Sequence, residues 1–366
     1  MKRKALNILL AVTAGALIFT VGIGVWVIPS RGFSKEENRA LATLSAPTLQ
    51  SLADGGFSEE LSAFFCDKLP CRISLIRLRA ISELLLLKGE CNGVVFCRDG
   101  YLLNRGEYAS LDAARESIAE ISELSASLEE SGVPVSVVYV PRAIDVMESK
   151  LPYLYDGSQD DILSLLPENS LNASLLTDLK SAARNGEYVW FKTDHHWTSR
   201  GAYITYVSLA SALDYTPYGR ELFTVKTVSE DFLGSIYSRA GCIAPSADKV
   251  ELYRYEGDTE YVVTLDDGRS YRGLYFSEFL KEKDKYSVFL GGNYSYLSIK
   301  KEGAENRPRL VIIKDSYANA LVPFLALHFD IEMIDPRFYR GYEEIYTMIK
   351  DADRVLIIQG LDTVAT

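Results

Sequence analysis

Three short apolar runs near the C-terminus constrain the fold more than any other feature of this sequence. The runs span Leu310 to Ile313, Ile331 to Ile334 and Val355 to Ile358. Helical patterns separate them, and such runs are typical of strands buried on both faces. The same order occurs earlier, where a 3.6-residue pattern over 107–131 stops at Gly132 and the apolar run Val135 to Val140 follows. We therefore expect an α/β domain with a mostly parallel sheet.

The N-terminal segment is basic and then apolar. Lys2, Arg3 and Lys4 precede an uncharged stretch over 5–30, which as a helix exceeds the roughly 30 Å hydrocarbon core of a bilayer. The basic flank favours an N-terminus inside the cell. We expect residues 1–30 to be a single-pass membrane anchor, and the chain from about Arg31 onward to be extracytoplasmic.

Cleavage of this segment as a signal peptide is the alternative. Small-residue cleavage motifs occur at Ala14-Gly15-Ala16 and Ala40-Leu41-Ala42. The first lies in the middle of the apolar run and the second well beyond its end. Their positions favour an uncleaved anchor.

Three regions follow the anchor. Residues 31–90 begin polar and continue with apolar residues at helical spacing, at Leu75, Leu78, Ile81, Leu84 and Leu85. We expect a helical stalk packed on the main domain. Residues 91–366 then form that domain, entered by a strand-turn unit with its turn at Asp99-Gly100. Residues 213–300 are rich in Tyr and Gly, with a hairpin turn at Asp266-Asp267-Gly268, and predict an irregular, partly β insertion.

Net charge and cysteine content limit the partners and the cellular compartment that this sequence allows. The formal charge of −11 argues against a nucleic-acid partner and favours a neutral or weakly charged substrate. Four of the five cysteines, Cys66, Cys71, Cys91 and Cys97, lie in one short region, and Cys242 is left over. An oxidising exterior permits disulfides there, and unpaired buried thiols are the alternative.

Two of the three histidines are adjacent in the segment WFKTDHHWTSRGAY over 190–203. Asp194 and His196 are two residues apart, so they face the same way on an extended segment but not on a helix. Thr198 is a plausible N-cap for a helix that follows. A carboxylate beside a histidine orients the ring as a serine nucleophile requires of its base. A structural Asp-His pair is the alternative.

Ser316 is the candidate nucleophile. It follows the apolar run that ends at Lys314 and precedes a helical pattern that begins after Asp315. Ligands of open α/β sheets bind at the carboxyl ends of strands, where helix N-termini favour anions. The segment lacks the Gly-x-Ser-x-Gly elbow of α/β-hydrolases, and a helix cap is the alternative role for this serine.

Further residues are candidates for binding substrate or an oxyanion. Gly292 permits close backbone approach and Asn293 offers an amide donor, although the pair also suits a hairpin turn. Asn319, after Ser316, joins this set. Arg142 and Arg337 follow predicted strand ends and are either substrate-binding or structural arginines in salt bridges.

A metal site at Asp194, His195 and His196 is the less favoured alternative. Adjacent histidines splay apart, and His328 lies in an apolar helical context. We expect no metal and no cofactor. His195 joins the candidates for binding substrate or an oxyanion, as a residue that supports its neighbour His196.

Several segments together resemble a known family. They are FSKEENRAL near residue 33, DKLPCR at 67–72, DHHW at 194–197, KYSVFLGGN, KDSYANALVPFL and IDPRFY, in this order. The chain from about Phe33 resembles the DHHW protein family and, more distantly, alginate O-acetyltransferases with an SGNH-hydrolase-like domain. The resemblance implies a three-layer, circularly permuted SGNH-like fold with the serine block last.

Carried over onto this sequence, the resemblance implies a catalytic triad of Asp194, His196 and Ser316. Lys314 stands where the relatives have glycine before the Asp-Ser pair, and His195 where they have threonine. The resemblance implies acetyl transfer to hydroxyls of a cell-surface or exported polysaccharide, with a polytopic membrane O-acyltransferase as partner. A carbohydrate acetyl esterase, or a non-catalytic polysaccharide-binding or assembly protein, is the alternative; the latter would use some of the 23 tyrosines for sugar stacking.

Overall fold

A computed structural model describes residues 2–27, 29, 31–34, 36–37, 39–105, 111–153, 155, 162–166, 171–244, 246–341 and 347–364. The chain forms two compact units. The N-terminal unit comprises Met1–Lys88 and Ser238–Ile243, and the sheet unit comprises Gly89–Tyr237 and Ala244–Thr366. The start of the helix expected over 107–131 lies outside the described residues.

The N-terminal unit is mainly helical. Its elements are α1 (Lys2–Val27), β1 (Phe33–Ser34), β2 (Arg39–Ala40), α2 (Leu49–Ala53), α3 (Gly56–Lys68) and α4 (Arg72–Leu85). Helix α1 is long and apolar enough to cross a bilayer, a property that signal sequences share. Helix α4 forms where the apolar spacing predicted it, yet Leu75, Leu78 and Leu85 are exposed. Cys66 and Cys71 are exposed thiols.

A seven-stranded sheet organises the sheet unit, in the order β10-β9-β11-β13-β12-β14-β6. The strands are β6 (Val135–Val140), β9 (Tyr261–Leu265), β10 (Ser270–Arg272), β11 (Tyr296–Lys301), β12 (Arg309–Lys314), β13 (Asp330–Ile334) and β14 (Arg354–Gly360). The expected strands β6, β12, β13 and β14 are all present.

The prediction of a mostly parallel sheet was wrong, because the sheet is mixed. Strand β12 is parallel to β13 and β14, and β14 is parallel to β6. Strands β10, β9, β11 and β13 pair antiparallel in succession. The segment expected to be an insertion thus supplies three strands of the sheet. Strand β9 alternates buried and half-buried residues, a pattern typical of antiparallel strands and weaker in sequence than an apolar run.

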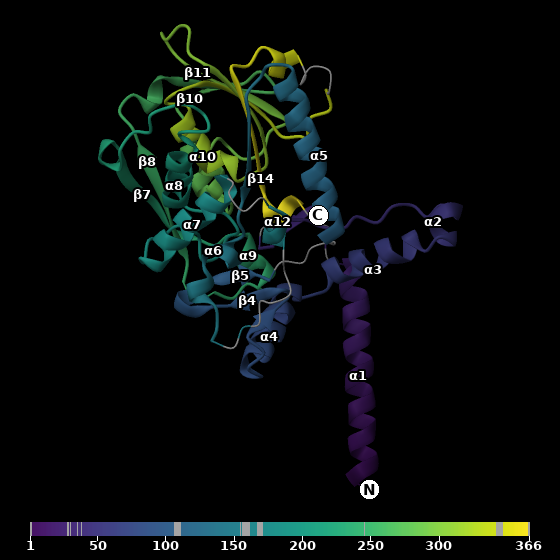
Figure 1. Cartoon of the computed structure of the whole chain (residues 1–366). Coiled ribbons are helices and arrows are strands. Elements are labelled where there is room, and N and C mark those ends of the chain that lie inside the picture. The colour runs from purple at the N-terminus through teal and green to yellow at the C-terminus, as the bar shows by residue number, and fades with distance from the viewer. Residues whose placement is uncertain are drawn as a thin grey trace. The chain divides into compact units, whose positions relative to one another are not determined.

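Helices cover both faces of the sheet (Figure 1). On one face, α7 (Leu171–Arg184), α8 (Ser199–Leu209) and α10 (Ala318–Leu325) share a core with Val138, Ile312 and Ile358. On the other face, α5 (Leu111–Glu130) packs Leu128 against Val311 and Val355. Alternate residues of each central strand therefore point into different cores, which is why these strands read as continuous apolar runs.

The remaining elements connect and border this framework. They are β3 (Glu90–Cys91), β4 (Val94–Phe96), β5 (Leu102–Asn104), α6 (Ala143–Val146), β7 (Thr224–Phe232), α9 (Ser235–Arg239), β8 (Asp248–Arg254) and α12 (Leu361–Val364). Short 3-10 turns span Arg98–Gly100, Glu148–Lys150, Ile162–Leu165, Arg220–Leu222, Asp258–Glu260, Ser277–Lys281 and Lys285–Val288. Strands β4 and β5 pair antiparallel across the turn predicted at Asp99-Gly100.

Candidate active site

Ser316 lies in the turn between β12 and α10, at the carboxyl end of a central strand. Asp315 holds this turn in place. One of its carboxylate oxygens accepts a hydrogen bond from Tyr317 N at 2.9 Å, and the other accepts from Gly360 N at 2.7 Å and Thr363 Oγ1 at 2.9 Å. The backbone before α10 is therefore fixed to the end of β14 and to α12.

The histidine segment forms a tight loop before α8. Trp190 and Trp197 form an isolated β-bridge across it, and the Thr198 side chain caps α8, as predicted. The indole N–H of Trp197 donates to Tyr317 O at 3.1 Å. This bond fastens the histidine loop directly to the serine turn.

The structure brings the three predicted residues together in one hydrogen-bonded chain. His196 Nε2 lies 2.8 Å from Ser316 Oγ, and His196 Nδ1 lies 2.6 Å from Asp194 Oδ1. Asp194 and His196 are buried, whereas Ser316 is half-buried. The histidine thus joins a carboxylate on one ring nitrogen to a hydroxyl on the other, the geometry that general-base activation of a serine requires.

Asp194 is held from its other side by residues that sequence analysis did not identify. Ser235 donates to Asp194 Oδ2 through its backbone N–H at 2.8 Å and its hydroxyl at 3.0 Å. A Cβ atom on Gly234 would lie 2.3 Å from Asp194 Cβ and Oδ2, so only glycine leaves room there. No motif marks this pair, since it lies about 40 residues after the histidine loop.

Two tyrosines enclose the His196 ring. Tyr286 stacks on it with ring centroids 3.7 Å apart and an angle of 6°, and the Tyr317 ring contacts it edge-on at 5.2 Å. The Tyr286 hydroxyl donates to Ser316 O at 3.1 Å. Tyr286 belongs to the KYSVFLGGN segment, whose glycines drew attention in the sequence while its tyrosine did not.

Burial sets the protonation states of the histidine and the carboxylate. Burial, reinforced by His195, lowers the pKa of His196 to about 4. Burial opposes ionisation of Asp194, but the two histidines and the hydrogen bonds that it accepts hold the pKa of its carboxyl well below its usual range. At neutral pH the pair is therefore neutral imidazole beside carboxylate, the state needed in a general base.

His195 lies beside this chain of hydrogen bonds rather than in it. Its Nδ1 is 2.7 Å from Ser235 Oγ, and its ring centroid is 3.8 Å from that of His196. Ligand atoms of Asp194, His195 and His196 lie within 4.8 Å of one another, so the three side chains offer donors for the metal site considered from the sequence. The same side chains are engaged in hydrogen bonds with one another, with Ser235 and with Ser316.

Lys314 gathers the predicted oxyanion residues around its buried ammonium group. Its Nζ donates to Asn293 Oδ1 and Asn319 Oδ1, both at 3.0 Å, and lies 3.6 Å from Asp335 Oδ2. Asn319 Nδ2 in turn donates to Gly292 O at 3.1 Å. Burial lowers the pKa of Lys314 to about 8. Asn319 thus serves the neighbouring loop, while Asn293 Nδ2 has no hydrogen-bond partner among the described residues.

Both predicted arginines form bidentate ion pairs. Arg142 is buried and bonds Asp145 through Nε and Nη2, each at 2.7 Å. It lines a cavity of about 20 Å³ together with Asp194 and His195. Arg337 bonds Asp335 at 2.9 and 2.7 Å and so supports the carboxylate that faces Lys314.

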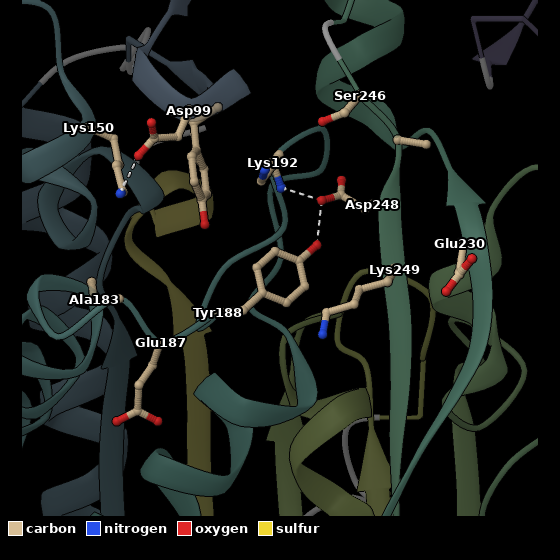
Figure 2. A pocket seen from close by; sticks show the side chains of 13 residues that line it. Asp99, Lys150, Ala183, Glu187, Tyr188, Lys192, Glu230, Ser246, Asp248 and Lys249 are labelled. Carbon is tan, nitrogen blue, oxygen red and sulfur yellow. Dashed lines mark hydrogen bonds and ion pairs between the residues drawn. The ribbon is translucent and has the colours of Figure 1, made fainter.

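A larger hollow of about 550 Å³ adjoins the histidine loop (Figure 2). Asp248, in its wall, is buried and accepts hydrogen bonds from Lys192 N at 2.7 Å, Thr193 N at 2.8 Å, Thr193 Oγ1 and the Tyr188 hydroxyl. These bonds fix the two residues before Asp194. Sequence analysis missed Asp248, because no local signal connects it to the loop.

The fold and the site place this chain in the class of proteins in which a serine, a histidine and an aspartate lie together at the edge of an α/β sheet. The family model described as DHHW protein matches residues 139–334. This span is more than half of the chain and contains Asp194, His196 and Ser316. The chain belongs to the DHHW protein family. Among curated proteins, none matches its sequence.

The first two of the following three solved structures share this fold. A DHHW family protein from Eubacterium siraeum DSM 15702 is 24% identical, with 76% of this chain and 93% of that chain covered and a TM-score of 0.57. Bacillus cereus PatB1 with a sulfonyl adduct is 20% identical, with 75% and 97% covered and a TM-score of 0.59. The O-acetyltransferase domain of Pseudomonas putida AlgJ is 16% identical, with 75% and 92% covered, at a TM-score of only 0.45.

Proposed function

We propose that this protein is an extracytoplasmic O-acetyltransferase that transfers acetyl groups to hydroxyls of a cell-surface or exported polysaccharide. Ser316 is the nucleophile, His196 the general base and Asp194 the group that orients it. The observation that carries this proposal is the hydrogen-bonded chain from Ser316 Oγ through His196 to Asp194. The fold is a circularly permuted, three-layer SGNH-like domain whose serine segment comes last.

The first half-reaction acylates the serine. His196 Nε2 takes the Ser316 proton while Oγ attacks the acetyl carbonyl, and the resulting imidazolium then protonates the donor's leaving group as its bond to the acyl carbon breaks. The tetrahedral oxyanion is stabilised by the backbone N–H of Ser316 and by the side-chain NH2 group (Nδ2) of Asn293, two donors that have no partner among the described residues.

The second half-reaction returns the serine. A sugar hydroxyl loses its proton to His196 Nε2 and attacks the acyl-serine, and the proton passes to Ser316 Oγ as the ester bond to the enzyme breaks. Asp194 stays ionised throughout, as its low pKa favours. If water takes the place of the sugar hydroxyl, the same site is a carbohydrate acetyl esterase. Helix α1 keeps the site at the membrane, beside a polytopic O-acyltransferase that supplies acetyl groups.

The test uses the full-length chain in mild detergent with 4-nitrophenyl acetate. We expect Ser316→Ala and His196→Ala to lower kcat roughly 10³-fold or more, since triad members act as a unit. Ser174→Ala, an exposed serine on α7, is the matched control. Inactivation by a sulfonyl fluoride should follow the same pattern, the choice of probe being guided by the adduct on PatB1. Full activity in Ser316→Ala would exclude it as nucleophile. With an oligosaccharide added as acceptor, acetylated sugar in the products separates transferase from esterase.

A further inference from the structure

A continuous groove beside the histidine loop has no part in the acyl-transfer steps above. The hollow of about 550 Å³ adjoins a second one of about 380 Å³, and both are lined by Glu187, Tyr188 and Lys249. Asp99 lines the first hollow and Arg220 the second, and the two hollows together are called the groove below. Such volumes are those of ligand sites rather than of packing defects.

The first of the two hollows lies next to the candidate active site. Lys192, in its wall, precedes Asp194 by two residues, so their Cα atoms are at most about 7 Å apart. Leu102 N donates to Lys192 O at 2.8 Å, which places β5 along the same loop. Tyr101 lines the groove, and Leu102 lines the small cavity beside Asp194. The groove and the site therefore share the histidine loop, and β5 is bonded to that loop.

The lining combines aromatic faces with many polar groups but little net charge. Figure 2 shows Tyr188 between Lys192 and Lys249, with its hydroxyl toward Asp248. Most charges are already paired. The pairs are Lys150 with Asp99, Lys249 with Glu251, and Arg200 with Glu187. Aromatic rings stack on the C–H faces of sugars, and fixed donors and acceptors bond their hydroxyls.

We propose that this groove binds an uncharged stretch of the acceptor polysaccharide, at sugar residues beyond the one that is acetylated. Binding along the groove holds the reacting hydroxyl near Ser316 and raises its effective concentration there. The inference rests on the proposed function for the reaction, but binding itself is measured independently of turnover. A polyanion is disfavoured, because the acidic residues of the lining, among them Glu230, offset its basic residues and leave no net positive charge.

The experiment uses full-length Ser316→Ala, which keeps the groove but not the nucleophile. Calorimetric titrations compare cellohexaose and hexa-N-acetylchitohexaose, both uncharged, with hexagalacturonate. We expect an uncharged hexasaccharide to bind, and Glu187→Ala and Tyr188→Ala in this background each to weaken it roughly tenfold. Glu116→Ala, an exposed glutamate on α5, is the control and should bind like the parent.

Absence of binding for every hexasaccharide, or equal weakening by Glu116→Ala, overturns the inference. Preferred binding of hexagalacturonate overturns its charge preference. The proposed function is tested separately, by measuring ester hydrolysis with the chain that retains Ser316. Binding of a hexasaccharide without any ester hydrolysis would support the inference about the groove and refute the proposed enzymatic function.

A second inference follows independently from α4. Its exposed apolar residues Leu75, Leu78, Ile81 and Leu85 have 48%, 60%, 41% and 78% of their surface exposed. Spacings of three and four residues put them on one face of the helix. Leu86 and Leu87, at the end of α4, are 71% and 91% exposed. A contiguous apolar stripe of this kind is uncommon on a surface that faces only water.

Basic residues border the stripe. Arg77 and Arg79 are exposed on α4, Lys88 follows it, and Glu83 is the one acidic residue within the helix. The other side of α4 is packed, since Ala80 is fully buried. The same unit contains α1, which is long and apolar enough to cross a bilayer. A leucine face bordered by arginines is typical of helices that lie in a lipid headgroup layer.

We infer that α4 lies flat in the headgroup layer of the membrane that α1 crosses. Its leucines then face the acyl chains, while Arg77, Arg79 and Lys88 contact anionic lipid phosphates. This second attachment gives the N-terminal unit a defined orientation at the surface, which a single spanning helix does not provide.

The test places a tryptophan on the stripe of the full-length chain in nanodiscs of phosphatidylcholine with phosphatidylglycerol. In Leu78→Trp we expect quenching by lipids spin-labelled near the headgroup to exceed that of the wild type at least twofold and to weaken without the anionic lipid. Leu124→Trp, an exposed leucine on α5 of the sheet unit, is the matched control and should show no added quenching. If lipid labels do not quench the tryptophan fluorescence of Leu78→Trp, the side chain is covered by protein or exposed to water. Either outcome overturns the inference.

Discussion

Replacing Asp248 tests how the histidine loop is held. Its carboxylate accepts four hydrogen bonds, from Lys192 N, from the backbone and hydroxyl of Thr193, and from the Tyr188 hydroxyl. In Asp248→Asn one oxygen remains as acceptor, while the new amide group donates instead. About two of the four buried donors then lack a partner, and at roughly 1–3 kcal/mol each the free energy of unfolding should fall by about 2–6 kcal/mol.

Urea unfolding followed by tryptophan fluorescence measures this loss, because two of the three tryptophans lie in the loop. We also expect a lower kcat for 4-nitrophenyl acetate in Asp248→Asn, since Thr193 directly precedes Asp194. Asp178→Asn is the matched control: Asp178 is exposed, accepts a single bond from Ser208, and should change stability by no more than about 0.5 kcal/mol. If Asp248→Asn unfolds and turns over like the control, the loop is not held by this carboxylate.

Three further predictions concern the site itself. Gly234→Ala should lower kcat strongly by displacing Asp194. In the control Gly32→Ala the new Cβ meets nothing within 4 Å, so kcat should be unchanged. Equal kcat values for the two variants would contradict the close packing at Gly234. Ester hydrolysis should decline as pH falls through about 4, where His196 gains a proton and ceases to be a base, and a midpoint near 6.5 would contradict its burial. The Lys314 pKa of about 8 lies below the usual lysine value of 10.5, so the unfolded chain binds more protons between these values and stability should rise with pH there. Lys314→Met should remove that rise in urea titrations, and a slope that persists would contradict it.

Local signals predicted the central framework of the fold well. Strands β6, β12, β13 and β14 are buried on both faces, so their apolar runs are visible in sequence, and Thr198 caps α8 as its residue type predicts. The hairpin turn predicted at Asp266-Asp267-Gly268 is present between β9 and β10. That β9 and β11 belong to the main sheet was not identified, because each has one face less buried and alternates like a surface segment rich in tyrosine. Their place in the sheet depends on pairings between distant segments, which no local pattern encodes.

The candidate site was predictable in its reacting groups but not in their supports. Asp194 and His196 share a short loop and Ser316 follows a strand, so spacing and strand ends pointed to them. Their geometry depends on Ser235 and Asp248, which reach the loop from residues about 40 to 55 positions later. Polar residues of this kind are ordinary in sequence, and their role follows only from the tertiary contacts.

The hydrogen bonds that Asp315 accepts determine when the site can assemble during synthesis of the chain. Residues 194–196 leave the ribosome well before Ser316, and Asp315 acquires its partners only when Gly360 and Thr363 have followed. A chain made from its N-terminus therefore has its histidine loop early, but the turn that holds Ser316 acquires these bonds only after Gly360 and Thr363 have emerged. Under the proposed function, the nascent protein has no activity before that point. Truncations or fusions close behind Thr363 then act on Ser316 although they lie far from it in sequence.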